Sequence, residues 1–504
     1  MDEPRPSKKP WYRARNIILI LFVVLLVVFL WAWRETAKVY HGKPNIAVDY
    51  RLEYRRLASQ AAGIEPNAAV DVWTALRETA LKVDELRLDF EQRILDEGYE
   101  PRCERDDGTV DFAYVHLGAE LSPAAEREIT FIRLLRDEGI FDDLAEIARD
   151  SPGMYPASAS GPLGADAYRD FTSWRAFRFL ARARVASMRL ALIDYDSHEV
   201  INAFRDTLAM AETVSFQPSL LGHFVAQSIA HVAERELRQE LMEAELDAAT
   251  CRELLATIGR HELAPFGLAV EAHRMHFYDI VQRTYTDDGE GDGYRLPWET
   301  IRLVRSWTPL ASAPDANPSW LEAARARFVE DSRADIVGHF DDGLAQCLAQ
   351  QDVLLLLPAD PDLAAFSVSQ VAGDSERDAV ELELQSIRRF LQGKARQRSH
   401  IDATRLAIAL ALHRALHRSF PDSLTALAPD ILPEIPLDAE FMRPFGYRLV
   451  TDDDGAQRYI LYRYGPDRTD DGGRIFEADP MRPRRETAAG YDIPCTLPRE
   501  PVPD

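Results

Sequence analysis

The sequence contains few cysteines and no closely spaced pair of them. Its 504 residues include Cys103, Cys251, Cys347 and Cys495, which lie far apart along the chain. The absence of Cys-x-x-Cys excludes a zinc ribbon and a thioredoxin-type redox motif. In an oxidising compartment the four thiols allow up to two disulfides, while scattered buried thiols are an equally open alternative.

Basic side chains are scarce relative to acidic ones. The chain has 59 Lys and Arg against 83 Asp and Glu, a net charge of −24. Because phosphate contacts require clustered Lys and Arg, we expect no nucleic-acid partner. The basic stretch 388–398 is expected to be a solvated helix face. Since single cores stop growing near ~250–300 residues, this length predicts more than one folded unit.

The common motifs of catalysis are also missing. No G-x-S-x-G elbow, Walker A loop or G-x-G-x-x-G fingerprint occurs, and the acidic segment 287–293 lacks the spacing of an EF-hand loop. Histidines recur in pairs at helical spacing. In the pair His413 and His417 the residue after the first histidine is Arg414 and not Glu, so the zincin pattern H-E-x-x-H is absent. These pairs are His223 with His231 near Glu234, His273 with His276 near Glu271, and His413 with His417. We expect structural roles for them.

One long apolar run stands out in a chain of soluble character. Ile17 to Trp33 has no polar or charged side chain and spans roughly 25 Å as a helix, near the lower limit for a bilayer core of about 30 Å. Trp11, Tyr12, Trp31 and Trp33 suit the two interfacial aromatic belts. A cleaved signal peptide is the alternative, but the run ends in Trp-Ala-Trp-Arg, without small residues for cleavage. Residues 16–34 are therefore predicted to be a retained transmembrane anchor in contact with the lipid bilayer.

Charge around this run predicts its orientation. Five basic and two acidic side chains give residues 1–33 a net charge of +3. Because the whole chain has a net charge of −24, the remaining residues carry −27. The positive-inside rule then places the basic tail, residues 1–15, in the cytoplasm and exports the bulk of the chain. The sequence predicts a single-pass protein of the bacterial cytoplasmic (inner) membrane whose bulk is periplasmic or otherwise extracytoplasmic.

The exported part has the periodicity of helices, so the predicted fold class is mainly α. Residues 45–150 form a helical region, 151–167 a Pro- and Gly-rich linker, and 168–396 an array of helical hairpins with a long loop at 285–320. Within the array, Ser197 is predicted to cap a helix. Successive helical hairpins of this kind resemble an α-solenoid.

The pattern changes from residue 400. An Ala- and Leu-rich helix leads to two aromatic runs, 445–450 and 458–465, which are joined by a Gly-containing loop and predict a β-hairpin. Residues 400–480 are therefore predicted to be a small α+β module, followed by an irregular tail at 481–504.

The order of motifs in this module carries a resemblance. F-P-D-S-L at 420–424, L-P-E-I-P-L-D at 432–438, Y-I-L-Y-R-Y-G-P-D at 459–467 and D-D-G-G at 470–473 resemble the C-terminal domain of type II secretion major pseudopilins. The module is also similar to one found in uncharacterised, membrane-anchored bacterial proteins. Unlike a pseudopilin helix, the apolar run lacks a Glu and follows no Gly-ended leader. We therefore interpret the module as reused.

The resemblance implies a calcium site in the loop after the last strands. The matching positions are Asp467, Asp470 and Asp471, with Glu477 and Asp479 as weaker candidates. Calcium takes ~6–8 oxygen ligands, which clustered carboxylates supply. The alternative is that Asp and Gly simply favour a solvated turn.

Together these features favour a non-catalytic, membrane-tethered interaction or scaffolding protein that binds other envelope proteins. One alternative is an envelope hydrolase or metal-dependent enzyme, which requires His223, His231, His273 or His276 to converge with carboxylates between helices. Another is an accessory component of a secretion-like assembly, which the module resemblance suggests.

Overall fold

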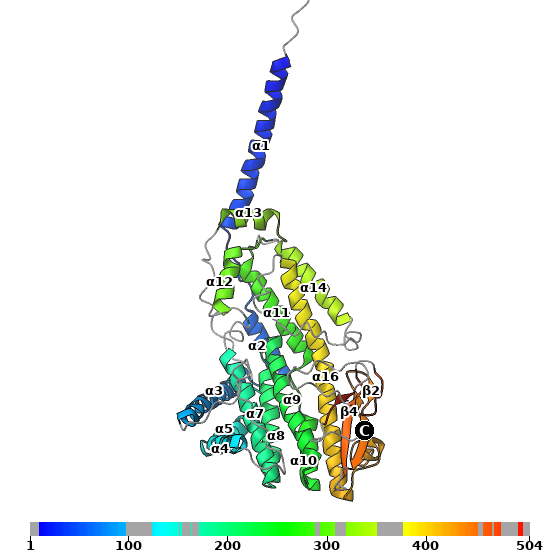
Figure 1. Ribbon diagram of the computed structural model, residues 1–504. Coiled ribbons are helices and arrows are strands. Elements are labelled where there is room, and N and C mark those ends of the chain that lie inside the picture. Colours follow the sequence, from blue (N-terminus) through cyan, green and yellow to red (C-terminus); the bar gives the residue numbers. More distant parts are fainter. Residues whose placement is uncertain are drawn as a thin grey trace, which may run out of the picture. The chain divides into compact units, whose positions relative to one another are not determined.

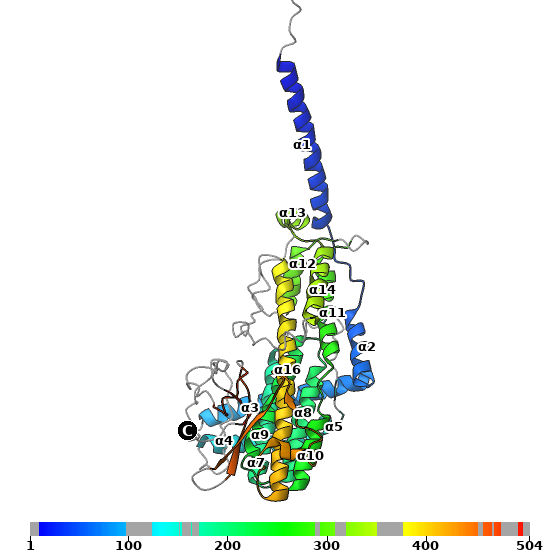
Figure 2. The ribbon, with the colours of Figure 1, turned by 90° about the vertical axis from the view of Figure 1, so that its right-hand side faces the viewer.

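The computed structural model confirms a mainly helical chain with small antiparallel sheets (Figures 1 and 2). It describes residues 10–96, 123–150, 152–153, 163, 171–287, 293–307, 319–349, 376–451, 457–465, 468–474 and 492–496. Most of the predicted linker 151–167 and most of the acidic segment 287–293 lie outside these ranges. The chain divides into two compact units, one of residues 1–49, 277–342 and 372–381, and the other of residues 50–276, 343–371 and 382–504.

The first unit contains the N-terminal helix and a group of short helices. Its helices are α1 (Pro10–Tyr40), α12 (Pro297–Trp307) and α13 (Trp320–Phe328). Three further helices contain residues of both units: α11 (Phe266–Thr284), α14 (Arg333–Ala349) and α16 (Glu376–His417). The buried side chains of the first unit include Val39 of α1 and Leu296, Trp298, Ala323 and Ala326.

The second unit is built on consecutive helices that pack side by side. Its helices are α2 (Tyr50–Ala62), α3 (Pro66–Asp96), α4 (Pro123–Asp137), α5 (Ile140–Arg149), α7 (Phe171–Ile193), α8 (Ser197–Ser215), α9 (Leu220–Leu241) and α10 (Ala248–Arg260). Connections of a few residues bring α7, α8 and α9 together, so that their apolar faces share one core. Phe177, Phe204 and Ile229 lie in that core.

The start of α8 differs by one residue from the prediction. The cap is Asp196, whose side chain accepts a hydrogen bond from the Glu199 backbone N–H at 3.1 Å, and Ser197 is the first helical residue. Both residue types cap helices well, and here Asp196 is the one placed to reach the N–H group three positions ahead.

Two predicted boundaries do not coincide with element ends. The stretch 285–320, predicted as a loop, contains α12 and a bridge between Tyr285 and Arg295. The predicted boundary between the array and the module, residues 396–400, falls inside the 42-residue helix α16. Composition changes there, but residues 396–400 contain no Pro or Gly, Gly393 is accommodated within the helix, and Ser399 donates back to the Ala395 carbonyl at 3.1 Å.

The C-terminal part carries both small sheets. β1 (Leu437–Asp438) pairs with β2 (Arg443–Pro444), and β3 (Gly446–Thr451), β4 (Gln457–Arg463) and β5 (Ile493–Pro494) form an antiparallel sheet in the order β3-β4-β5. β3 and β4 match the two predicted strand runs, whereas their connection, 452–456, lies outside the described residues. β5 lies in the tail that was predicted to be irregular. Tyr459 and Leu461 of β4 pack on Leu406 and Leu410 of α16.

Candidate functional site

The apolar helix α1 has the length and hydropathy of a membrane span. Its segment Ile17–Tyr40 has a mean hydropathy of 2.8 in its most apolar window, and none of that window is buried against the rest of the chain. Leu25 is 66% exposed and Phe29 58%. A core helix of this composition is covered by neighbouring elements, whereas α1 leaves its apolar side chains uncovered. The helix therefore has the surface expected of an element that faces lipid.

The last turns of α1 belong to the folded part of the first unit. Val39 is fully buried beside Trp298, and Tyr40 contacts the Trp320 ring at 4.9 Å between centroids. Glu35 is 7% exposed and accepts two hydrogen bonds from Arg327, at 2.9 and 3.1 Å. The apolar segment and these packed residues form one continuous helix.

One of the two histidines singled out on α11 contacts a carboxylate. His273 and His276 of α11 lie 6.4 Å apart between ring centroids, and His273 Nε2 is 2.9 Å from Glu383 Oε2. Burial opposes ionisation of Glu383, but the hydrogen bond from His273 and the charge of His276 lower its pKa overall. The His276 ring instead forms a hydrogen bond with the backbone, with its Nδ1 2.5 Å from the Leu163 carbonyl oxygen.

The second pair, on α9, faces different parts of α16. The His223 ring packs edge-on against Phe390 at 4.6 Å, and the His231 ring lies 4.2 Å from that of His400. Phe390 and His400 are ten residues apart, about 15 Å along a helix. Burial lowers the pKa of His223 to about 4, and burial together with nearby arginines lowers that of His231 to about 3. Both rings are therefore neutral near pH 7 and contribute to packing.

The third predicted pair lies at the end of α16. His413 and His417 are 4.4 Å apart between ring centroids, and His413 Nδ1 bonds to the Ser419 carbonyl at 2.9 Å. This bond supports the turn that follows the helix. Within the described part of the chain, no group of three or more His, Cys, Asp or Glu side chains is arranged to hold a metal ion.

The acidic turn of the C-terminal module contains two of the predicted calcium ligands. Asp470 Oδ1 accepts from the Tyr462 hydroxyl and the Gly472 N–H, both at 2.9 Å. Asp471 Oδ2 is buried without a hydrogen-bond partner. Asp467, Glu477 and Asp479 lie outside the described residues.

A residue that the sequence did not single out joins this turn. Asp492 is fully buried, its Oδ2 accepts from the Gly473 N–H at 2.8 Å, and its Oδ1 has no partner. Burial raises the pKa of Asp492 to about 6, and the neighbouring charges of Asp470 and Asp471 add to this rise. The two unpartnered carboxylate oxygens have the chemistry that calcium takes, whereas Asp470 is engaged by Tyr462 and Gly472.

Buried arginines tie the C-terminal segment to the helices of the second unit. Arg238 is 2% exposed and donates to the carbonyls of Cys495 and His400, both at 3.1 Å, and to Thr404 Oγ1 at 2.6 Å. Arg463 of β4 is 3% exposed and lies 2.7 Å from Glu440 Oε2. These contacts join positions up to 257 residues apart, so no local sequence signal identifies them.

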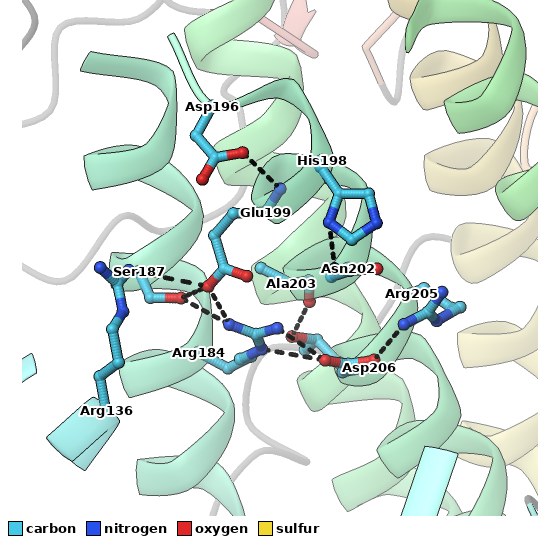
Figure 3. Close-up of polar contacts among 11 residues, drawn as sticks. Arg136, Arg184, Ser187, Asp196, His198, Glu199, Asn202, Ala203, Arg205 and Asp206 are labelled. Atoms are coloured by element: carbon cyan, nitrogen blue, oxygen red, sulfur yellow. Dashed lines mark hydrogen bonds and ion pairs between the residues drawn. The ribbon is translucent and has the colours of Figure 1, made fainter. Parts of the chain in front are cut away.

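A second buried charge network lies between α7 and α8 (Figure 3). Arg184, 2% exposed, reaches Asp206 Oδ2 at 2.7 Å and Glu199 Oε1 at 2.5 Å, and it donates to Ser187 Oγ at 2.9 Å. Asp206 is fully buried, and burial raises its pKa although Arg184 and Arg205 pull it down. The satisfied donors and acceptors indicate a structural role in pairing the two helices.

The cysteines that the structure describes are buried thiols. Cys251, Cys347 and Cys495 are buried, Cys251 and Cys495 are free thiols, and Cys103 lies outside the described residues. Burial raises the pKa of Cys251 and of Cys495 to about 11, so both thiols are protonated near pH 7.

The chain matches no family model, no curated protein and no solved structure. The resemblance of residues 400–480 to a pseudopilin module therefore stays a prediction.

Proposed function

We propose that this chain is a single-pass, membrane-tethered protein with residues 1–15 in the cytoplasm and its bulk on the extracytoplasmic side of a bacterial inner membrane. The observation that carries the proposal is α1, a helix of membrane-spanning length whose apolar side chains are uncovered and whose last turns are packed into a folded unit. A cleaved signal peptide is expected to leave no such packing, because its helix is removed from the mature chain.

The test of the anchor uses the full chain in bacterial cells. We expect it to stay in the membrane pellet after alkaline extraction, with its N-terminal peptides present in the mature protein. Val24→Arg together with Val27→Arg places two charges in the span, at about 2.5–3.5 kcal/mol each, and should release the chain. The matched control, Val24→Ile with Val27→Ile, should remain membrane-bound. Recovery of a mature chain that starts after residue 33 would contradict the anchor.

The orientation has a separate test. In spheroplasts, an added protease should degrade the bulk of the chain, while an epitope placed at the N-terminus stays protected. Protection of the bulk would reverse the proposed topology and leave the anchor intact.

For the exported part we propose a non-catalytic interaction role among envelope proteins. The support is that the candidate histidines of the sequence have packing partners: His223 contacts Phe390, His231 contacts His400, and His276 bonds to a backbone carbonyl. Photo-crosslinking from Tyr195, which is 83% exposed in the turn between α7 and α8, tests the role in intact envelopes. Repeated capture of one envelope protein supports it, and crosslinks to lipid alone, from this and other exposed sites, contradict it.

Calcium binding at the acidic turn is a second proposal, favoured by the unpartnered oxygens of Asp471 and Asp492. Bound calcium should raise the melting temperature of the full chain in detergent through ligand linkage. The Asp471→Asn, Asp492→Asn variant should lose this rise, whereas Asp430→Asn, at another acidic position of the module, should keep it. An unchanged melting temperature of the parent chain in calcium would remove the proposal.

A further inference from the structure

Helix α13 carries large apolar side chains that stay exposed within the described part of the first unit. Leu321 is 80% exposed, Phe328 43% and the following residue, Val329, 76%. Leu321 and Phe328, at i and i+7, lie on one side of the helix, and Val329 is the C-cap residue that follows them. Single exposed apolar residues are ordinary, but Leu321 and Phe328 on one face of a nine-residue helix, with Val329 directly after it, form a patch.

The opposite face of α13 is fixed by its packing in the first unit. Ala323 and Ala326 are fully buried and share a cluster with Val39 of α1. Arg327 holds Glu35 of α1, and its guanidinium carbon lies 4.4 Å from the centre of the Tyr294 ring. Rotation of α13 to hide Leu321 would break these contacts, so the exposed direction is part of the fold.

The patch is continuous with the aromatic end of the apolar helix. Trp31 contacts the Phe328 ring at 5.6 Å between centroids, and Trp33 contacts that of Trp320 at 4.5 Å. Figures 1 and 2 show α13 lying across the lower end of α1, within the same unit. Trp31 and Trp33 are themselves 54% and 52% exposed. Tryptophans at the end of a span sit at headgroup depth, so α13 lies at that depth as well.

A positive charge on the exposed face of α13, that of Arg325, also suits the headgroup layer of a bilayer. Arg325 lies four residues after Leu321, its side chain is 60% exposed, and its Nε is 3.3 Å from Glu330 Oε1. A long cationic side chain between apolar ones suits the headgroup layer, where the stem lies among acyl chains and the guanidinium meets phosphate.

We propose that α13 is an interfacial helix whose Leu321, Phe328 and Val329 enter the lipid surface beside the end of α1. The inference rests on the proposed membrane anchor and adds a second membrane contact to it. With one contact through α1 and another through α13, the first unit is held in a defined orientation against the bilayer, because rotation about α1 would withdraw the apolar patch from lipid.

Spin-label depth measurement on the full chain tests this contact. A Cys103→Ser background is used, because the cysteines that the structure describes, Cys251, Cys347 and Cys495, are buried. Single labels are placed at Leu321→Cys and Phe328→Cys, with Leu26→Cys in the span and Ala334→Cys, an exposed position of α14 in the same unit, as references. The chain is reconstituted in vesicles of equal parts phosphatidylethanolamine and phosphatidylglycerol. Collision with oxygen is compared with collision with a water-soluble nickel complex.

We expect labels at 321 and 328 to collide with nickel several-fold less than the label at 334, at a depth between those of 334 and 26. If 321 and 328 match 334 while 26 lies deep, the interfacial helix is wrong and the anchor stands. If 26 also matches 334, the anchor itself fails and this inference with it. Spin–spin broadening at 321, which reports a second copy on the patch, would overturn the lipid contact as well.

Discussion

Removal of Arg184 should reveal how much the buried charge network between α7 and α8 contributes to stability. In Arg184→Met, Asp206 stays fully buried but loses both guanidinium contacts, and its remaining cationic neighbour is Arg205, at 3.2 Å. The Arg205 side chain is 44% exposed, so water screens its charge. The carboxylate is then a buried charge with little compensation.

The size of the stability loss in Arg184→Met follows from the cost of protonating Asp206. An unperturbed Asp has a pKa near ~3.9, so neutralising it at pH 7 costs at most about 4 kcal/mol. That ceiling agrees with the roughly 3–5 kcal/mol typical of breaking a buried ion pair. We expect Arg184→Met to lower the free energy of unfolding by about 3 kcal/mol at pH 7.

The pH dependence of this deficit has a definite sign. In the variant, native Asp206 has a raised pKa and binds a proton that the unfolded chain releases above about pH 4. The variant therefore loses stability as the pH rises and recovers it as the pH falls toward 4. Urea unfolding of the full chain in detergent, followed by circular dichroism between pH 4.5 and 8, measures the effect.

Two further variants make the reasoning refutable. Arg184→Met combined with Asp206→Leu should recover most of the loss, because the fully buried charge is gone and Glu199, whose side chain is 20% exposed, keeps Arg136 at 3.8 Å. Arg205→Met removes a half-exposed partner of the same carboxylate and should cost less than about 1 kcal/mol. A deficit in Arg184→Met that is below about 1 kcal/mol at every pH, or a double variant as unstable as the single one, would refute the argument.

Three other outcomes follow from single positions. Burial lowers the pKa of His223 to about 4, so the unfolded chain binds a proton at a higher pH than the folded chain does. The free energy of unfolding should therefore fall by about 2 kcal/mol between pH 7 and pH 5. His223→Gln should flatten this pH dependence in urea titrations. Gly446→Ala should lower the free energy of unfolding by about 1–3 kcal/mol, because its Cβ would collide with the Tyr462 ring; an unchanged urea midpoint contradicts this. Gly338→Ala, in α14 with open space around it, should raise that free energy by about 0.5–1 kcal/mol, and a lower melting temperature would count against it.

Local patterns were sufficient for much of the secondary structure. The apolar run at 17–33, the helical periodicity around Phe177 and Phe204, and the aromatic runs at 445–450 and 458–465 each correspond to described elements. These features depend on neighbouring residues, which the chain order supplies directly. Boundaries were less well predicted. Asp196 and Ser197 both cap helices well, and a change of composition near residue 400 does not by itself end a helix.

The sequence alone determined the apolar helix, the sign of the charge on either side of it and the mainly helical character of the rest. The tertiary structure decided which side chains meet. It placed Arg238 against Cys495, buried Asp492 beside the acidic turn and set His223 and His231 against separate parts of α16. It also left Leu321 and Phe328 exposed, with Phe328 beside Trp31. Such pairings join residues that are far apart along the chain, and they depend on the packing of whole helices, which no local pattern encodes.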